Sequence, residues 1–184
     1  EAFKSISNTE FFTKLAQAIT HELSNMTEEG YFFRVDLRLR PDGSAGPVAS
    51  SFTACQNYYS SWGETFERMA LIKTRPAAGS IELGEEFCQA FNSFIYRKFL
   101  DFAALEEIQE IKTRIESKLA GKNKRVRHVK LGAGGIREIE FFVQALQLIY
   151  GGRNPQLQER STVKALSIVQ ENRFISVDES AALL

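Results

Sequence analysis

The sequence predicts an α+β fold that is predominantly helical, with a partial sheet near the N-terminus followed by a helical domain. Residues 31–40 alternate apolar and polar side chains with a period of two, which is typical of a strand. In most of the remaining chain, apolar residues recur at helical spacing. Pro76 and Gly79 interrupt this pattern, so we expect one domain over residues 1–79 and a second, helical domain over residues 80–184.

Helical segments lie on both sides of the predicted strand. Before it, Ser7 and Glu10 form a capping box in front of an apolar face over residues 11–23. After it, Pro41 and the glycines that follow end the strand. We then expect helices over residues 51–62, 64–75, 82–100, 102–120, 136–150 and 160–174.

The composition is that of an ordinary globular protein and excludes several classes. Lys+Arg and Asp+Glu both number 23, so no net charge draws the chain toward nucleic acid or a membrane. No apolar run approaches the ~18 residues of a membrane span, and no signal-peptide pattern opens the chain. Cys55 and Cys88 form no metal-binding pair and no disulfide framework. We therefore expect a cytoplasmic protein.

The two ends of the sequence suggest a piece of a longer protein. The chain begins at Glu1 without a methionine. It stops soon after Ser176 and Glu179, which offer a capping box for a further helix. We expect neighbouring sequence on both sides.

Asp36 is the acidic residue of the predicted strand, and it shares one strand face with Arg34, Arg38 and Arg40. Residues two apart on a strand lie about 6.6 Å apart on the same face. One interpretation places a metal on the carboxylate and phosphates on the guanidiniums. The other is a solvated face with exposed Asp–Arg pairs, and spacing alone favours it.

The glycines before residue 136 are a second candidate site. Backbone N–H groups at a helix start attract anions, and Lys130 and Arg137 add charge beside Gly134 and Gly135. The pattern is neither a dinucleotide fingerprint nor a Walker A loop. A plain helix start with a flexible entry explains it as well. The basic run over residues 122–130 is best interpreted as a solvated connector, because it has no interleaved aromatic residues.

Four blocks of sequence resemble one family, glutamine synthetase adenylyltransferase, the bifunctional bacterial enzyme of nitrogen control. These blocks read VDLRLRP, GSAGPVASSF, YYSSWGETFERMALIKTR and KLGAGGIREIEFFVQALQLIYGGRNPQLQERS. The resemblance runs from about residue 31 to residue 184. It implies that the partial sheet is that of a polymerase-beta-like nucleotidyltransferase.

The resemblance also indicates one half of that two-half enzyme. Arg137 and Glu138 stand in GGIREIEF where the other half typically has Thr-Asp, and GETFERMALIKTR is similar to the N-terminal version. That half is the adenylyl-removing one. Its implied reaction is phosphorolysis of AMP from a tyrosine of glutamine synthetase, with ADP as product.

The resemblance implies specific roles for residues of this chain. Asp36 would be the third carboxylate of the catalytic site and would bind Mg²⁺ or Mn²⁺. ADP or ATP and inorganic phosphate would be substrates. The implied phosphate- or nucleotide-binding residues are Arg38, Arg40, Lys73, Lys130, Gly134, Gly135 and Arg137. Glu138 and Glu140 are further candidates, of which at most one would face the site because they fall on different helix faces.

The other two carboxylates belong to a Gly-Ser…Asp-x-Asp motif that this chain does not contain. Its aspartates are Asp36, Asp42, Asp101 and Asp178, and no two of them are two residues apart. We therefore expect the chain alone to be inactive.

The implied partners are glutamine synthetase and the PII signal-transduction protein, with no nucleic acid and no membrane. Two alternatives stay open at this point. One is a related nucleotidyltransferase, the uridylyltransferase that modifies PII. The other is a helical regulatory or interaction module without chemistry.

Overall fold

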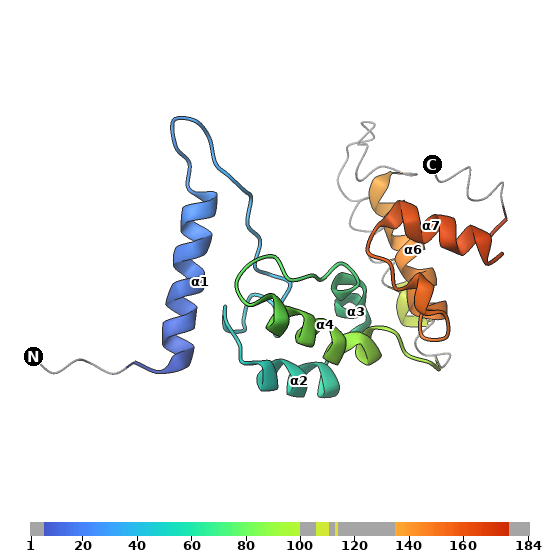
Figure 1. Cartoon of the computed structure of the whole chain (residues 1–184), viewed down its shortest axis with the longest axis horizontal. Coiled ribbons are helices and arrows are strands. Elements are labelled where there is room, and N and C mark those ends of the chain that lie inside the picture. Colours follow the sequence, from blue (N-terminus) through green and yellow to red (C-terminus); the bar gives the residue numbers. More distant parts are fainter. Residues whose placement is uncertain (1–5, 100–105, 111–112, 114–134, 177–184) are drawn as a thin grey trace, which may run out of the picture. The chain divides into compact units, whose positions relative to one another are not determined.

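The computed structural model describes residues 6–99, 106–110, 113 and 135–176 (Figure 1). The chain divides into two compact units, Glu1–Trp62 and Gly63–Leu184, and each is described here by itself.

The first unit contains two helices, α1 (Asn8–Ser24) and α2 (Phe52–Ser61). Both begin at a serine cap, as the sequence predicted for the first of them. The Ser7 hydroxyl accepts a hydrogen bond from the Glu10 amide at 3.2 Å, and the Ser51 hydroxyl accepts one from the Ala54 amide. No residue of α1 is buried, so its apolar face stays exposed in this chain.

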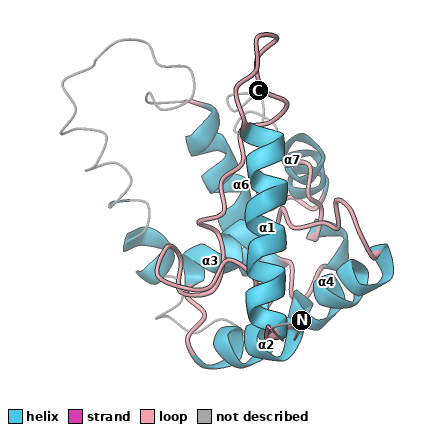
Figure 2. Cartoon of the chain, turned by 90° about the vertical axis from the view of Figure 1, so that its left-hand side faces the viewer, coloured by secondary structure: helices cyan, strands magenta, loops and turns pink. Residues whose placement is uncertain are grey.

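The predicted strand over residues 31–40 does not form. Figure 2 reserves magenta for strands and shows none in the described residues, where an isolated bridge between Thr27 and Gly30 is the sole β pairing. A strand needs a neighbour to receive its backbone hydrogen bonds, and no second strand-like segment is present in that part of the chain. Side chains of both alternating sets are exposed, including Phe32 at 80% and Leu39 at 74%. The described fold is therefore mostly helical, and the expected partial sheet is absent from it.

The second unit is entirely helical where it is described. Residues 106–110 are helical and belong to the helix expected over residues 102–120, most of which lies outside the described residues. The named elements are α3 (Thr65–Leu71), α4 (Ile81–Ile95), α6 (Ile136–Tyr150), the 3₁₀ turn η1 (Pro155–Leu157) and α7 (Thr162–Glu171).

Helix α3 packs against α4 and α6, and α7 packs against α6 and η1 (Figure 1). The main core cluster joins these helices through Met69, Ile72, Ile95, Tyr96, Ile108 and Leu148. A smaller cluster fixes α7 on α6 through Val143, Ala165 and Leu166. Helix α6 contributes to both clusters and so connects α7 to the helices of the main core.

Helix α3 ends earlier than the sequence predicted, at Leu71 rather than near residue 75. The chain tightens into turns there, with the Lys73 amide bonded to the Ala70 carbonyl and the Thr74 amide bonded to the Leu71 carbonyl. Pro76 follows shortly, and a residue before proline is biased away from helical geometry. In the part of the chain described, no helix is long and apolar enough to span a membrane.

Candidate functional site

Asp36 lies on the exposed segment that follows α1 and is paired with Arg38. The Arg38 Nε donates to Asp36 Oδ1 at 2.9 Å, and Arg38 Nη2 donates to Oδ2 at 2.5 Å. The Arg38 backbone amide also donates to Oδ1 at 3.0 Å. These hydrogen bonds lower the pKa of Asp36 to about 2, and the carboxylate in turn raises the pKa of Arg38. The carboxylate is thus ionised and held in a forked pair.

Arg40 has a different environment from Arg38. Its guanidinium donates to the backbone carbonyls of Leu37, Ser44, Gly46 and Pro47. These bonds close the turn that begins at Pro41. In that turn Asp42 has a positive φ of 58°, and a Cβ on Gly46 would lie 2.1 Å from the Pro41 carbonyl oxygen. Arg40 therefore stabilises the conformation of the loop that follows Asp36.

The described residues do not by themselves fit a divalent metal pair. A two-metal site needs several carboxylates around the ions. No group of three or more His, Cys, Asp or Glu side chains comes together among those residues. Asp36 is one carboxylate, and Arg38 already occupies both of its oxygens. A metal at Asp36 would need further ligands and a displacement of Arg38.

Lys73 belongs to the second unit, where its side chain connects two segments that are far apart in the sequence. Its Nζ donates to the Arg160 carbonyl at 2.5 Å and to Thr162 Oγ1 at 2.7 Å. The bond links the turn after α3 to the start of α7 across 87 positions of sequence. In this structure Lys73 is engaged by the protein itself.

The helix start at Gly135 agrees with the sequence prediction, because α6 begins at Ile136 directly after it. The Gly135 carbonyl accepts from the Glu138 amide at 2.9 Å, and no side chain caps the helix. Arg137 is exposed, and Glu138 and Glu140 are half-buried. Lys130 and Gly134, which sequence analysis placed in the same site, lie outside the described residues.

The predicted site residues fall in both units. Asp36, Arg38 and Arg40 are together in the first, whereas Lys73, Gly135 and Arg137 belong to the second. Within the first unit the structure joins Asp36 directly to Arg38. Lys73 donates a hydrogen bond to Thr162 at the start of α7.

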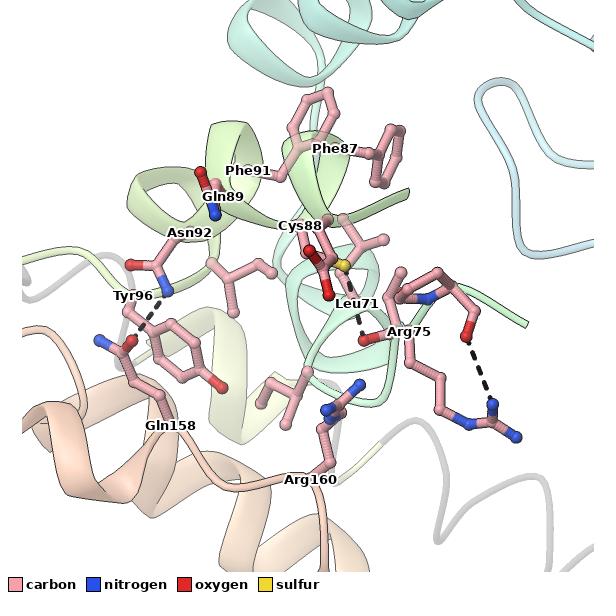
Figure 3. Close-up of a pocket in the computed structure, with 15 residues that line it drawn as sticks. Leu71, Arg75, Phe87, Cys88, Gln89, Phe91, Asn92, Tyr96, Gln158 and Arg160 are labelled. Carbon is pink, nitrogen blue, oxygen red and sulfur yellow. Dashed lines mark hydrogen bonds between the residues drawn. The ribbon is translucent and has the colours of Figure 1, made fainter. Parts of the chain in front are cut away.

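A pocket of about 510 Å³ in the second unit contains none of these predicted residues (Figure 3). It lies among the end of α3, α4 and the segment before α7. Arg75 and Arg160 line this pocket, and the sequence alone did not indicate a binding role for either of them. Arg160 belongs to the block GGRNPQLQERS, which resembles the family but contains no pattern typical of a binding site.

Close packing at two glycines of that block shapes the same region. A Cβ on Gly151 would lie 2.7 Å from the Tyr96 ring, and one on Gly152 would lie 2.1 Å from the Arg97 carbonyl oxygen. Glycine at both positions lets the chain after α6 approach the end of α4. The sequence showed these glycines only as a helix break.

Two family models match different parts of the chain. Residues 1–90 match the model described as glutamate-ammonia ligase adenylyltransferase. Residues 105–184 match the model described as GlnD PII-uridylyltransferase.

Curated relatives match nearly the whole chain. Each of the following is named as a bifunctional glutamine synthetase adenylyltransferase/adenylyl-removing enzyme. The protein of Methylococcus capsulatus is 47% identical over 90% of this chain, and that of Hahella chejuensis is 42% identical over 98%. The protein of Pseudomonas aeruginosa is 42% identical over 95% of the chain. This chain spans less than a fifth of each relative, 17%, 19% and 18% of their lengths respectively.

Proposed function

Because this chain belongs to the family of bifunctional glutamine synthetase adenylyltransferase/adenylyl-removing enzymes, we propose that it is part of the half that removes AMP from glutamine synthetase. The reaction proposed is phosphorolysis. An oxygen of inorganic phosphate attacks the AMP phosphorus, and the bond from phosphorus to the tyrosine oxygen breaks. The products are ADP and glutamine synthetase with an unmodified tyrosine side chain. The identity of 42–47% over 90–98% of the chain supports the family role.

The sequence block at the start of α6 supports the choice of half, because Arg137 and Glu138 stand where the other half typically has Thr-Asp. Arg137 and Glu138 lie in the first turn of a helix that begins directly after Gly135. Helix starts offer N–H groups to anions, and Arg137 is exposed beside this one. We propose that Gly135 and Arg137 bind a phosphate group of the substrate, with Lys130 and Gly134 as neighbours.

Asp36 is proposed to supply one carboxylate to a catalytic site completed by other parts of the longer enzyme. Its low pKa keeps it ionised across the physiological range, as a metal ligand must be. The described residues lack the remaining metal ligands. We therefore propose that Mg²⁺ or Mn²⁺ binds only in the whole enzyme, where other parts supply those ligands. Arg38 could turn from Asp36 to a phosphate oxygen, whereas Arg40 would first have to release the loop carbonyls that it binds.

We further propose a nucleotidyltransferase part over residues 1–79 and a helical part over residues 80–184. In the whole enzyme, residues 31–40 would form a strand once a neighbouring strand supplies backbone partners. Glutamine synthetase is the proposed substrate protein, PII the proposed regulator, and the cytoplasm the proposed location.

The match of residues 105–184 to the PII-uridylyltransferase model supports a second candidate, a uridylyltransferase of the same superfamily. The curated adenylyltransferase relatives cover those residues as well, at 42% identity over 98% of the chain. We therefore favour the adenylyl-removing role. A helical module without chemistry is the remaining alternative.

A pair of matched variants in the full-length bifunctional enzyme tests the proposal. Asp36→Asn should abolish phosphate-dependent formation of ADP from adenylylated glutamine synthetase and leave AMP attachment from ATP intact. Asp42→Asn is the control, because it removes the same charge from an exposed position six residues away and asparagine tolerates the positive φ there. Loss of attachment with retained removal would assign the chain to the other half. Unchanged activities would rule out a catalytic Asp36.

A further inference from the structure

The pocket in the second unit combines an aromatic wall with cationic side chains. Phe87, Phe91 and Tyr96 from α4 and its end line it, and Figure 3 shows Arg75 and Arg160 on the side away from the two phenylalanines. Phe87 and Phe91 pack together with ring centroids 4.4 Å apart. The volume of about 510 Å³ falls within the range of small-molecule sites, about 300–1,000 Å³.

The cationic side chains of the pocket have unused donors. Neither Arg75 nor Arg160 forms an ion pair with any carboxylate of the described residues. The single hydrogen bond given by the Arg75 guanidinium is a long one of 3.4 Å to the adjacent Pro76 carbonyl, and the Arg160 side chain gives none there. Guanidiniums bind carboxylates and phosphates in a forked geometry, so these two can still accept an anion.

Tyr96 adds a neutral donor to the same pocket. Its ring is buried, and burial raises the pKa of its phenol to about 12. The hydroxyl therefore keeps its proton at neutral pH. Tyr96 and Arg160 both line the pocket.

The backbone at Arg160 is held by hydrogen bonds from the turn after α3 and from α6, whereas the Arg160 side chain forms no hydrogen bond with the described residues. Lys73 Nζ donates to the Arg160 carbonyl at 2.5 Å. Gln147 of α6 donates to the preceding Glu159 carbonyl at 2.6 Å. A donor on a fixed backbone loses less conformational entropy when a ligand binds.

The pocket wall beside Arg160 contains Gln158, whose side chain is also fixed by hydrogen bonds. Gln158 accepts a hydrogen bond from Asn92 Nδ2 at 2.8 Å and donates to the Gly151 carbonyl at 2.9 Å. These bonds join α4 to the segment before α7 across the pocket. The pocket walls therefore come from elements that are bonded to one another.

The charges of the pocket favour an anion. Glu85 also lines it and is the acidic side chain there, against two arginines. The Glu159 carboxylate is close in sequence but does not line the pocket, and its Oε1 accepts a hydrogen bond from the Ser161 amide at 2.8 Å. We propose that this pocket binds a small organic anion, with its carboxylate or phosphate group on Arg75 and Arg160 and its apolar body against Phe91 and Tyr96. This binding is independent of the transferase role.

The test uses the 184-residue chain and three probes that share an aromatic ring. Benzoate carries a carboxylate, phenyl phosphate carries a phosphate, and benzamide is the neutral counterpart. Amide chemical shifts followed by NMR should move in α4 and at residues 158–160 when either anion is added. Benzamide should bind at least about tenfold more weakly, since a hydrogen bond to a charged group is worth about 1.5–3 kcal/mol. The stronger of the two anions identifies the preferred group.

Three single variants complete the experiment. Arg75→Gln and Arg160→Gln should each weaken the binding of the anions about tenfold. Both arginines are exposed and bind no other element, so the fold should survive, which circular dichroism will check. Arg173→Gln removes the same charge outside the pocket and should bind as the parent does. Equal binding of benzamide and benzoate, anion binding unaltered by either pocket variant, or no binding at millimolar concentration would each overturn the proposal.

Discussion

Gln147 offers the sharpest test of how the second unit is held together. Its side chain is 1% exposed, and its Nε2 donates to the Leu157 carbonyl at 2.7 Å and the Glu159 carbonyl at 2.6 Å. Gln147→Leu keeps a similar volume but leaves both carbonyls without this donor. A buried acceptor left unpaired costs about 1–3 kcal/mol, so the two together cost about 2–6 kcal/mol.

An opposing term reduces that loss. The Gln147 Oε1 atom is buried and has no hydrogen-bond partner among the described residues, and leucine removes this unpaired atom. The relief is again about 1–3 kcal/mol, so the net destabilisation should be about 2 kcal/mol. With a urea m-value of about 2 kcal/mol/M, the midpoint of unfolding should fall by about 1 M.

The assay is urea unfolding of the 184-residue chain followed by far-UV circular dichroism. Gln144→Leu is the matched control, because Gln144 is half-buried on the same helix and its side chain donates no hydrogen bond to a loop of the described residues. If Gln147→Leu unfolds at the same urea concentration as Gln144→Leu, the bonds to residues 157 and 159 do not stabilise the unit.

Three further predictions concern single side chains. The folded-state pKa of Asp36, about 2, lies below its ordinary value of 3.8, so its pairing stabilises the chain above pH 3.8 and that effect is lost as the pH falls toward 2. An NMR titration of the carboxyl carbon should reproduce this pKa, and Arg38→Gln should raise it. Lys73→Met removes two hydrogen bonds to the segment at the start of α7 and should lower the free energy of unfolding by about 1–3 kcal/mol in urea. Gly84→Ala would normally stabilise a helix by about 1 kcal/mol. Here the new Cβ would lie 2.5 Å from the Pro76 Cβ, so calorimetry should instead show a lower melting temperature.

Local signals in the sequence predicted where the described helices begin better than where they end, because α3 ends at Leu71 rather than residue 75 and α4 at Ile95 rather than residue 100. Ser7 caps α1 as expected, and α6 occupies the predicted residues 136–150. Capping and helical periodicity act within a few residues, so one segment contains the information. The strand over residues 31–40 failed because a strand depends on a second segment that the described chain does not provide.

The pocket could not be predicted for a related reason. Its walls come from positions as distant as Arg75 and Arg160, and the Lys73 bond that fixes one wall spans 87 positions. No local pattern records such a contact. The Asp36–Arg38 pair joins residues only two apart, so the sequence could indicate it. An exposed Asp–Arg pair was one of the two interpretations of this segment, and the structure contains that pair.

The exposed segment over residues 31–39 has a consequence for the chain in concentrated solution. Tyr31, Phe32, Phe33 and Leu39 present large apolar surfaces to water, each more than half exposed. Such a segment is a template for pairing between copies, and the charge of Arg34 opposes that pairing by repulsion between copies, whereas Asp36 compensates the charge of Arg38. Salt screens this repulsion, so self-association of the isolated chain should rise with ionic strength.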